Sequence, residues 1–309
     1  CGAHFDRHQG ILYRVVLRRL WPGMKLYTYD WHAGEHPFND HVFIVENGRT
    51  EKMLGYEDGP GFRTEAPFDP AFCINNRSYP GSGMAFGKDG TAYYPLVTYK
   101  PGQDYSFNRG GVRLMRRDPA SGQWLASEPQ YVTPAISSRG LLEPDVAVLG
   151  NGNLLVVCRG SNTPQTPGRK WMCISGDGGR TLSAVEELRY DDGTSFYSPS
   201  SIHRFLRSSR NGKLYWVANI VPDPPQGNGP RYPLCLAEID EKKLAVIKDS
   251  VRVLDDRRVE DAAELQLSNW SQLENRETLD WEFYLSRIGQ ASGHFWASGV
   301  YRYIFTPPP

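Results

Sequence analysis

The sequence predicts an all-β protein built from repeated four-stranded antiparallel sheets, the arrangement of a β-propeller. Strands are favoured over helices because 31 Gly and 23 Pro residues interrupt the 309-residue chain. Turns such as Glu46-Asn47-Gly48 separate short runs rich in Val, Tyr and Leu. A repeat points the same way, since the turn glycines Gly90, Gly152 and Gly212 lie 62 and 60 residues apart. Each of them separates one apolar strand from a second, richer one.

The composition excludes several classes of function. Lys plus Arg and Asp plus Glu are both 35, so the net charge is zero and gives no sign of nucleic acid or a membrane surface as partner. No apolar run is long enough to cross a bilayer. The sequence has no Gly-rich phosphate loop, no His/Cys metal spacing and no Gly-x-Ser-x-Gly elbow. We therefore expect neither a metal nor another cofactor.

The chain length favours a single β domain, and the cysteines fit the strands of such a domain. No Cys-x-x-Cys pair occurs, so we interpret the five cysteines as buried strand residues rather than a metal site or a disulfide framework; they are Cys1, Cys73, Cys158, Cys173 and Cys235. We expect a single domain over residues 1–309. Because Cys1 opens in what resembles the end of a strand, a missing first N-terminal strand stays open as an alternative.

The first strands are predicted before residue 55. Residues 11–19 are typical of a strand, and residues 41–46 and 50–54 predict a hairpin about Asn47-Gly48. The stretch 55–83, rich in Gly, Pro and Asn, follows as a long irregular loop. Loops of this length are usually functional or mobile.

The repeated unit follows this loop. Its predicted copies pair residues 84–86 with 91–97, 145–149 with 154–158, 201–205 with 214–218 and, more weakly, 264–267 with 281–285. The segment Leu236 to Leu267 fits a helix on propensity, but its Val and Ile residues and the charged turn at Asp240 to Lys243 also suit a hairpin, which we prefer.

A turn motif lies at Ser175 to Leu182, in the pattern Ser-x-Asp-x-Gly-x-Thr followed by a large apolar residue. Gly178 and Gly179 permit a tight turn with positive φ, and the short Ser, Asp and Thr side chains can bond nearby backbone groups. The motif predicts a hairpin whose turn is held by hydrogen bonds from its own side chains, here called a hairpin lock.

The motif and its surroundings resemble the sialidase (neuraminidase) superfamily. Ser175 to Leu182 is similar to that family's Asp-box, or BNR repeat, and Glu143-Pro144 followed by Arg159 is similar to its central Glu and later Arg. The resemblance covers most of the chain in the order of the blades. It implies a six-bladed β-propeller, a secreted or periplasmic location, and glycan or oligosaccharide substrates.

The resemblance also implies how an acidic sugar would be bound. Sialidases hold the sugar carboxylate with three arginines, whose guanidinium forks match a carboxylate and keep their charge. Arg159 is similar to the second of the three and Arg231 to the third. The strand expected to carry the first has no counterpart in this chain.

The implied catalytic residues are Asp6, Glu143 and a tyrosine. Asp6 matches the family's acid/base position, with a solvated end residue as the open alternative. Glu143 matches the group that activates a Tyr nucleophile, with a turn-capping carboxylate as the alternative. The tyrosine expected near Val259 is absent, and Tyr197 is the substitute candidate, although a bulky loop residue is the plainer description.

Three other features have plainer interpretations. His203-Arg204 is typical of a strand pair with one residue facing the axis and one buried. The cluster Asp255 to Arg258 predicts a solvated turn. The polar segment from Leu267 to Thr278, with Trp270 embedded in it, fits either a sugar-facing loop or a hairpin tip.

Three functions remain open. The first is an exo-acting glycoside hydrolase of the sialidase type that removes a terminal acidic sugar. The second is a propeller enzyme that cleaves another carbohydrate, such as a uronate-containing polysaccharide by elimination, with a Tyr or His base. The third is a non-catalytic glycan-binding propeller. The sequence leaves the sugar, the linkage and the oligomeric state open.

Overall fold

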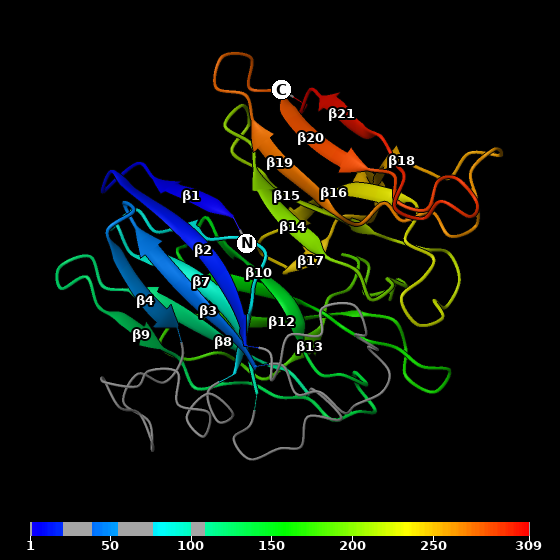
Figure 1. Ribbon diagram of the computed structural model, residues 1–309. Coiled ribbons are helices and arrows are strands. Elements are labelled where there is room, and N and C mark those ends of the chain that lie inside the picture. Colours follow the sequence, from blue (N-terminus) through cyan, green and yellow to red (C-terminus); the bar gives the residue numbers. More distant parts are fainter. Residues whose placement is uncertain (1, 21–38, 55–76, 100–108, 309) are drawn as a thin grey trace. The chain divides into compact units, whose positions relative to one another are not determined.

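The computed structural model describes residues 2–20, 39–54, 77–99 and 109–308 (Figure 1). Strands and turns make up these residues, apart from a single turn of 3-10 helix at Lys248–Ser250. Within the described ranges no helix has the length and apolar character needed to span a membrane.

The described strands form five sheets, each following the order of the chain. The first contains β1 (Ala3–Asp6), β2 (Ile11–Leu20), β3 (Asn39–Glu46) and β4 (Thr50–Leu54). The second contains β5 (Ser78–Pro80), β6 (Ala85–Phe86), β7 (Ala92–Thr98), β8 (Gly111–Arg117) and β9 (Trp124–Ala126). The third contains β10 (Leu142–Val148), β11 (Leu154–Arg159), β12 (Lys170–Ser175) and β13 (Glu186–Glu187).

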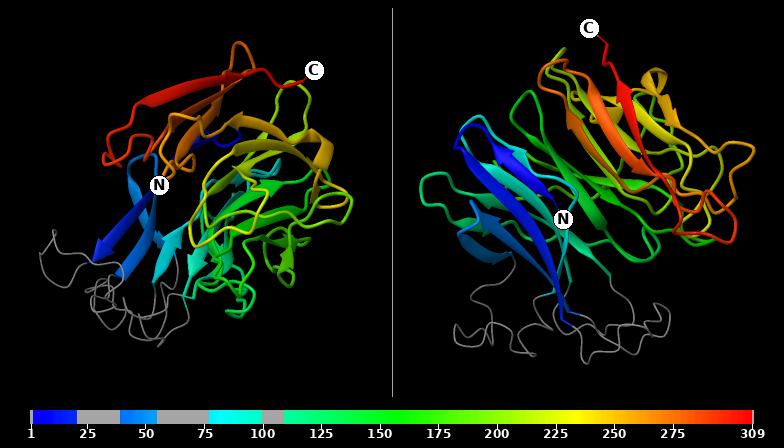
Figure 2. Two further views of the ribbon diagram at one scale, coloured as in Figure 1. Left: turned by 90° about the vertical axis from the view of Figure 1, so that its right-hand side faces the viewer. Right: turned by 45° about the horizontal axis from the view of Figure 1, so that its top comes forward.

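The last two sheets come from the C-terminal part of the chain. The fourth contains β14 (His203–Arg207), β15 (Leu214–Asn219), β16 (Leu234–Asp240), β17 (Ala245–Val246) and β18 (Arg252–Asp255), and both β17 and β18 pair with β16. The fifth contains β19 (Trp270–Glu274), β20 (Trp281–Ser286) and β21 (Val300–Phe305). The arrows in Figure 2 show the twist expected of each sheet.

The prediction of an all-β propeller with antiparallel sheets is confirmed, but the prediction of six blades is wrong. The described residues form five sheets. The number six came from the family resemblance, whereas a period of about 60 residues fits only about five times into the 309 residues of this chain.

Most predicted hairpins are confirmed. The strand at residues 11–19 is β2, the turn at Asn47-Gly48 joins β3 to β4, and β16 and β17 form the hairpin preferred over a helix. The weak fourth copy is wrong, because β20 pairs with Trp270–Glu274 and not with residues 264–267. The predicted loop at 55–83 lies largely outside the described residues.

The chain divides into two compact units, and the third sheet contributes to both. Unit 1 comprises Cys1–Pro134, Arg139–Cys158 and Cys173–Val185. Unit 2 comprises Ala135–Ser138, Arg159–Met172 and Glu186–Pro309.

The core of unit 1 lies between the first and second sheets. Alternate residues of each strand point into it, among them Tyr13 on β2, Ile44 on β3 and Leu96 on β7, which are fully buried. The ring of Trp124 meets Tyr13 edge to face, with centroids 6.0 Å apart. Each such side chain stabilises the fold by about 1.5–3 kcal/mol.

The core of unit 2 joins the fourth and fifth sheets in the same way. Trp281 on β20 is fully buried and packs edge to face on Tyr215 of β15, with ring centroids 4.7 Å apart. Leu236 and Phe283 belong to the same cluster. The strands β15 and β16, which flank the connection that contains Arg231, are therefore packed against the fifth sheet within unit 2.

The predicted hairpin lock is confirmed between β12 and β13. Asp177 Oδ1 accepts hydrogen bonds from Ser175 Oγ (2.8 Å) and the Thr181 backbone N–H (3.0 Å), and Asp177 Oδ2 accepts one from Thr181 Oγ1 (2.7 Å). These donors, with those of Thr181 first, lower the pKa of Asp177. Gly178 and Gly179 adopt φ values of 69° and 82°.

Three cysteines lie in strand interiors, as predicted. Cys158 on β11, Cys173 on β12 and Cys235 on β16 are buried free thiols. Burial raises the pKa of Cys158 well above its ordinary value and that of Cys235 to about 11. Cys1 and Cys73 lie outside the described residues.

Candidate functional site

Arg159 ends the buried strand β11. The five residues before it are fully buried and apolar, so the strand is fixed in the core and places its last side chain at its end. Arg159 Nε donates to Ser200 Oγ at 2.8 Å, and Nη2 donates to Asn228 Oδ1 at 3.5 Å.

Arg231 lies in the connection from β15 to β16 and reaches the same two partners. Its Nη2 donates to the Ser200 carbonyl at 2.9 Å and its Nε to the Asn228 carbonyl at 3.0 Å. Its Nη1 donates to Gln266 Oε1 at 2.8 Å and to Ser268 Oγ at 3.3 Å. Arg231 is thus held at all three guanidinium nitrogens.

The structure brings the two predicted carboxylate-binding arginines together within unit 2. Arg159 and Arg231, here called the arginine pair, both bond to Ser200 and to Asn228. Ser200 and Asn228 offer neutral oxygens, which orient the two guanidiniums. Two oriented guanidiniums suit a carboxylate ligand.

Lys170 holds Ser200 in place from within the protein. Its side chain is fully buried, and Nζ donates to the carbonyls of Pro199 at 3.0 Å and Ser201 at 2.8 Å, on either side of Ser200. The Ser200 hydroxyl also lies 3.2 Å from Ser161 Oγ. The shared partner of the arginine pair is therefore itself fixed.

His203 lies close to these positive charges and is neutral. It is fully buried, and its Nδ1 accepts a hydrogen bond from Trp216 Nε1 at 3.1 Å, which places the ring proton on Nε2. Burial lowers the pKa of His203 well below its ordinary value, and the charges of Lys170, Arg159 and Arg204 lower it further. Within the described structure, Nε2 has no hydrogen-bond partner.

This environment makes folding pH-dependent. Because the pKa of His203 is depressed in the folded state, the unfolded chain takes up a proton below the ordinary value of 6.5 that the folded chain does not. We expect this stability to be complete above pH 6.5 and to fall by up to about 1.4 kcal/mol per pH unit below it. His203→Asn should lose that slope in urea unfolding between pH 6.5 and 5. Equal slopes in the two proteins would contradict the assignment.

Tyr197 also belongs to unit 2, and Arg169 covers its ring. The Arg169 guanidinium carbon lies 4.2 Å from the ring centroid, and Arg169 is in turn paired with Glu187 at 2.9 Å. The Tyr197 carbonyl accepts a hydrogen bond from the Val221 N–H at 3.0 Å. These contacts place the predicted nucleophile beside Arg169.

Glu143 lies in unit 1 with an unusual backbone. Its φ is 36°, in the left-handed region that non-glycine residues avoid. Ser82 fixes the next peptide, because its N–H donates to the Pro144 carbonyl at 2.7 Å. Such a conformation costs about 1–3 kcal/mol and is concentrated at functional sites.

Asp6 lies in the turn between β1 and β2. Its Oδ1 accepts hydrogen bonds from the backbone N–H groups of His8 at 2.8 Å and Gln9 at 3.3 Å. Asp6 is fully buried, so the alternative of a solvated end residue is wrong. It lies at the hairpin-turn end of its sheet, whereas Glu143 lies at the end of β10 away from the β10–β11 turn.

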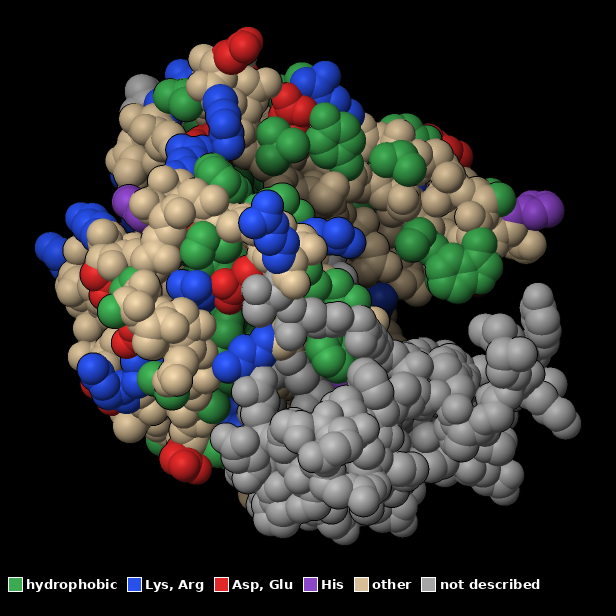
Figure 3. All heavy atoms as spheres, turned by 60° about the vertical axis from the view of Figure 1, so that its left-hand side comes forward, with side chains coloured by type: hydrophobic (Ala, Val, Ile, Leu, Met, Phe, Trp, Pro, Cys, Tyr) green, Lys and Arg blue, Asp and Glu red, His purple; other side chains and the backbone are tan. Residues whose placement is uncertain are grey.

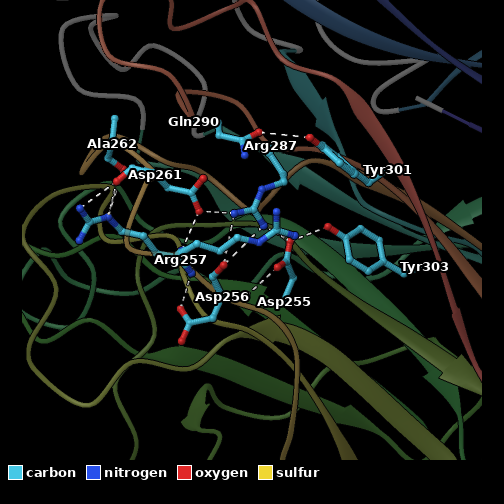
Figure 4. A network of polar contacts seen from close by, with 10 residues as sticks. Asp255, Asp256, Arg257, Asp261, Ala262, Arg287, Gln290, Tyr301 and Tyr303 are labelled. Atoms are coloured by element: carbon cyan, nitrogen blue, oxygen red, sulfur yellow. Dashed lines mark hydrogen bonds and ion pairs between the residues drawn. The ribbon is translucent and has the colours of Figure 1, made fainter.

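A second polar cluster in unit 2 surrounds Arg287 (Figure 4). Arg287 Nη1 is paired with Asp255 Oδ2 and Nη2 with Asp261 Oδ2, and Arg287 is fully buried. The Tyr303 hydroxyl donates to Asp255 Oδ2 at 2.6 Å. Burial and then Asp255 raise the pKa of Tyr303 to about 12, which keeps it a neutral phenol.

The prediction of a solvated turn at Asp255 to Arg258 is confirmed for Asp256, Arg257 and Arg258, which are exposed, and is wrong for Asp255. Asp255 is buried in an ion-pair network, and Arg257 Nη2 donates to the Asp261 carbonyl at 2.9 Å. Trp270 is likewise buried in the core, so the alternative of a sugar-facing loop fails for this residue. Sequence reasoning missed Arg287 because its partners lie more than 25 residues earlier in the chain.

The partners of the arginine pair were also missed, although two local signals could have indicated them. The run Ser198-Pro199-Ser200-Ser201 directly precedes a strand, and Gln226 to Arg231 is a polar, Gly-rich connection. Both are typical of loops that use backbone and hydroxyl groups for binding. In the described part of the chain, no group of three or more His, Cys, Asp or Glu side chains is placed to hold a metal ion.

Comparison with known proteins gives similarity in structure alone. No model of a protein family matches the sequence, and no curated protein matches it significantly. A protein of unknown function from Dyadobacter fermentans DSM 18053 is similar with a TM-score of 0.59 and 14% identity, over 97% of this chain and 73% of that one.

Two glycosidases are also similar in structure. NanB sialidase from Streptococcus pneumoniae, as its K499G mutant, has a TM-score of 0.54 and 15% identity, over 86% of this chain and 35% of its own. RS223-Beta-xylosidase has a TM-score of 0.50 and 14% identity, over 100% of this chain and 92% of its own. This chain spans about a third of the length of NanB sialidase. At these identities the likeness establishes the propeller fold.

Proposed function

We propose that this chain is a propeller glycoside hydrolase of the sialidase type, which binds a terminal acidic sugar of a glycan through the arginine pair. The observation that carries the proposal is the meeting of Arg159 and Arg231 at Ser200 and Asn228. A sugar carboxylate is the ligand whose geometry and charge best match two oriented guanidiniums. The similarity in fold to NanB sialidase and RS223-Beta-xylosidase supports a carbohydrate substrate.

The proposed catalytic groups are Glu143, Asp6 and Tyr197. The left-handed backbone of Glu143 supports a functional role, since strained backbone clusters at functional sites. Asp6 is proposed as the acid/base residue because it stands at the position that the family resemblance assigns to that role. Tyr197 is proposed as the nucleophile.

A non-catalytic glycan-binding protein is the second candidate. Two observations favour it. Asp6 Oδ1 is engaged in its own turn, and the ring of Tyr197 is covered by Arg169. Such a protein would keep the arginine pair and would not need the catalytic groups.

The experiment compares binding and hydrolysis in a set of variants. Wild-type protein should bind an acidic monosaccharide, and Arg231→Ala should weaken that binding about 100-fold or more, because it removes charged hydrogen bonds worth about 1.5–3 kcal/mol each. Arg276→Ala removes an exposed arginine of unit 2 and is the matched control, expected to have no effect. A methyl ester of the same sugar should bind weakly to all three proteins.

Hydrolysis then separates the two candidates. Release of fluorophore from a sialoside, lost in Glu143→Gln with sugar affinity unchanged, would support the hydrolase. Binding without release would favour the glycan-binding protein. A folded wild-type protein that binds neither sialic nor uronic acids would refute both.

A further inference from the structure

Asn228 is an exposed asparagine that is followed by a glycine, in the connection from β15 to β16 that also contains Arg231. Asn-Gly pairs are prone to deamidation, because glycine lets its backbone nitrogen reach the side-chain carbon of the asparagine. The sequence contains four such pairs, and the other three begin at Asn47, Asn151 and Asn211. The surroundings of the four asparagines differ.

The other three asparagines are held by backbone groups. Each side-chain oxygen accepts a hydrogen bond from a backbone N–H at 2.8–3.0 Å: Asn47 from Leu12, Asn151 from Asn153 and Asn211 from Lys213. The glycines that follow them have φ values between 71° and 87°, as tight hairpin turns require. A backbone N–H fixes the amide and brings no charge to it.

Two guanidiniums contact Asn228. Arg159 Nη2 donates to its Oδ1 at 3.5 Å, and Arg231 Nε donates to its backbone carbonyl at 3.0 Å. On the face drawn in Figure 3, Lys and Arg side chains lie at several separate places with Asp and Glu among them. What distinguishes Asn228 from the other three asparagines is therefore local, namely a cation bonded to each of its two carbonyl oxygens.

Each arginine suits one requirement of deamidation. The Gly229 N–H must lose its proton to a solvent base, and Arg231 promotes this loss because it withdraws electron density from the peptide that joins Asn228 to Gly229. The nitrogen then attacks the side-chain carbon of Asn228, and Arg159 stabilises the negative charge that develops on Oδ1. The bond from this carbon to Nδ2 breaks, and ammonia leaves with a proton from water. Water opens the resulting succinimide to aspartate or isoaspartate.

The backbone at Gly229 has room for the attack. Its N–H donates to the Gln226 carbonyl at 3.2 Å, at the long end of the range for such a bond. A Cβ added at Gly229 would meet no atom within 4 Å, so the nitrogen can approach the side chain without displacing a neighbour. Because Asn228 is exposed, water can reach the succinimide.

We propose that Asn228 is a site of spontaneous deamidation, and that the new carboxylate occupies the arginine pair and excludes the acidic sugar. The modification is independent of the proposed function, whereas the exclusion rests on it. The carboxylate forms where Oδ1 already contacts Arg159, so it gains a charge-assisted hydrogen bond and competes with a ligand carboxylate. Isoaspartate adds an atom to the backbone and displaces the carbonyl that Arg231 holds. Affinity for the acidic sugar is therefore lost as the protein ages.

Peptide mapping by mass spectrometry, during incubation of the full chain at mildly alkaline pH, measures conversion at all four Asn-Gly pairs. Asn228 should convert about 10-fold faster than the other three, because a positioned donor to a developing oxyanion commonly contributes at least this much. Arg159→Met should slow Asn228 to the rate of the others. Gly229→Ala should block conversion and leave the turn intact, since there is room for its Cβ.

Binding of an acidic monosaccharide measures the consequence for the arginine pair. Asn228→Asp should weaken this binding about 10-fold or more, the effect of a single competing charged hydrogen bond. Asn151→Asp places the same charge in an exposed turn of unit 1 and is the matched control, expected to bind as wild type does. Wild-type protein aged at alkaline pH should lose affinity, and Gly229→Ala aged in the same way should keep it.

The outcomes separate this inference from the proposed function. Equal conversion at the four pairs would refute the modification, whether or not the protein binds a sugar. Fast conversion that persists in Arg159→Met would refute the part played by that arginine. If fresh wild type binds the monosaccharide and Asn228→Asp binds it equally well, the exclusion is refuted. If fresh wild type does not bind it, the proposed function fails and the exclusion with it, while mass spectrometry still decides the modification.

Discussion

Replacing Arg287 by Met should lower the free energy of unfolding by about 3–5 kcal/mol, the usual cost of breaking a buried ion pair. Arg287 is fully buried between Asp255 and Asp261, so its loss leaves two carboxylates buried without their cation. The Tyr303 hydroxyl and the Asp256 backbone N–H would remain as neutral donors to Asp255. Chemical denaturation at pH 7 measures the change.

Two controls make this prediction specific. Arg302→Met breaks an ion pair with Glu282 in which Arg302 is 50% exposed, and solvent should make that loss small. In a background with Asp255→Asn and Asp261→Asn, Arg287→Met should be far milder, because the charges left behind are gone. An Arg287→Met variant no less stable than Arg302→Met would show that the buried network contributes nothing to folding.

Gly140→Ala should destabilise unit 1 by more than about 3 kcal/mol, a loss reserved for severe steric or backbone conflicts. Gly140 has a φ of 76°, and a Cβ there would lie 2.1 Å from the Gly110 carbonyl oxygen and 2.8 Å from its nitrogen. The two glycines are bridged, so backbone rather than a movable side chain would have to shift. Gly140 precedes Glu143 by three residues, and its substitution should also displace that carboxylate.

Gly152→Ala is the matched control for Gly140→Ala. Gly152 also has positive φ, 87°, but a Cβ there has nothing within 4 Å. Its substitution should cost only about 1–2 kcal/mol, the price of the left-handed backbone. Thermal unfolding of both variants measures the difference. Similar losses at the two positions would show that the close approach of Gly110 and Gly140 is unimportant.

Local sequence patterns were sufficient to predict most of the hairpins. Turn residues such as Asn47-Gly48 determine where a hairpin reverses, so the sequence alone predicts the joint between β3 and β4. The strand β19 was misplaced because Trp270–Glu274 carries Ser, Gln and Glu among its five residues and resembles a loop. Its partner β20 supplies the buried face, and that information is not local.

The site was predictable only in part, for a similar reason. Arg159 and Arg231 stand out because each follows or precedes an apolar strand, and the order of motifs along the chain singles them out. Ser200 and Asn228 are ordinary polar loop residues until separate connections bring them to the same guanidiniums. Asp255 looked solvated because a run of charges usually is, and only the distant Arg287 changes its surroundings.

The alkylation rates of the buried thiols report how often each of the two units opens. An alkylating reagent reacts with thiolate, so Cys158 and Cys235, with raised pKa values and no access to solvent, react only when their surroundings open. Cys158 belongs to unit 1 and Cys235 to unit 2, so mass spectrometry of alkylated peptides would time the opening of each unit separately. Equal rates would mean that the two units open together, as the prediction of a single domain over residues 1–309 requires.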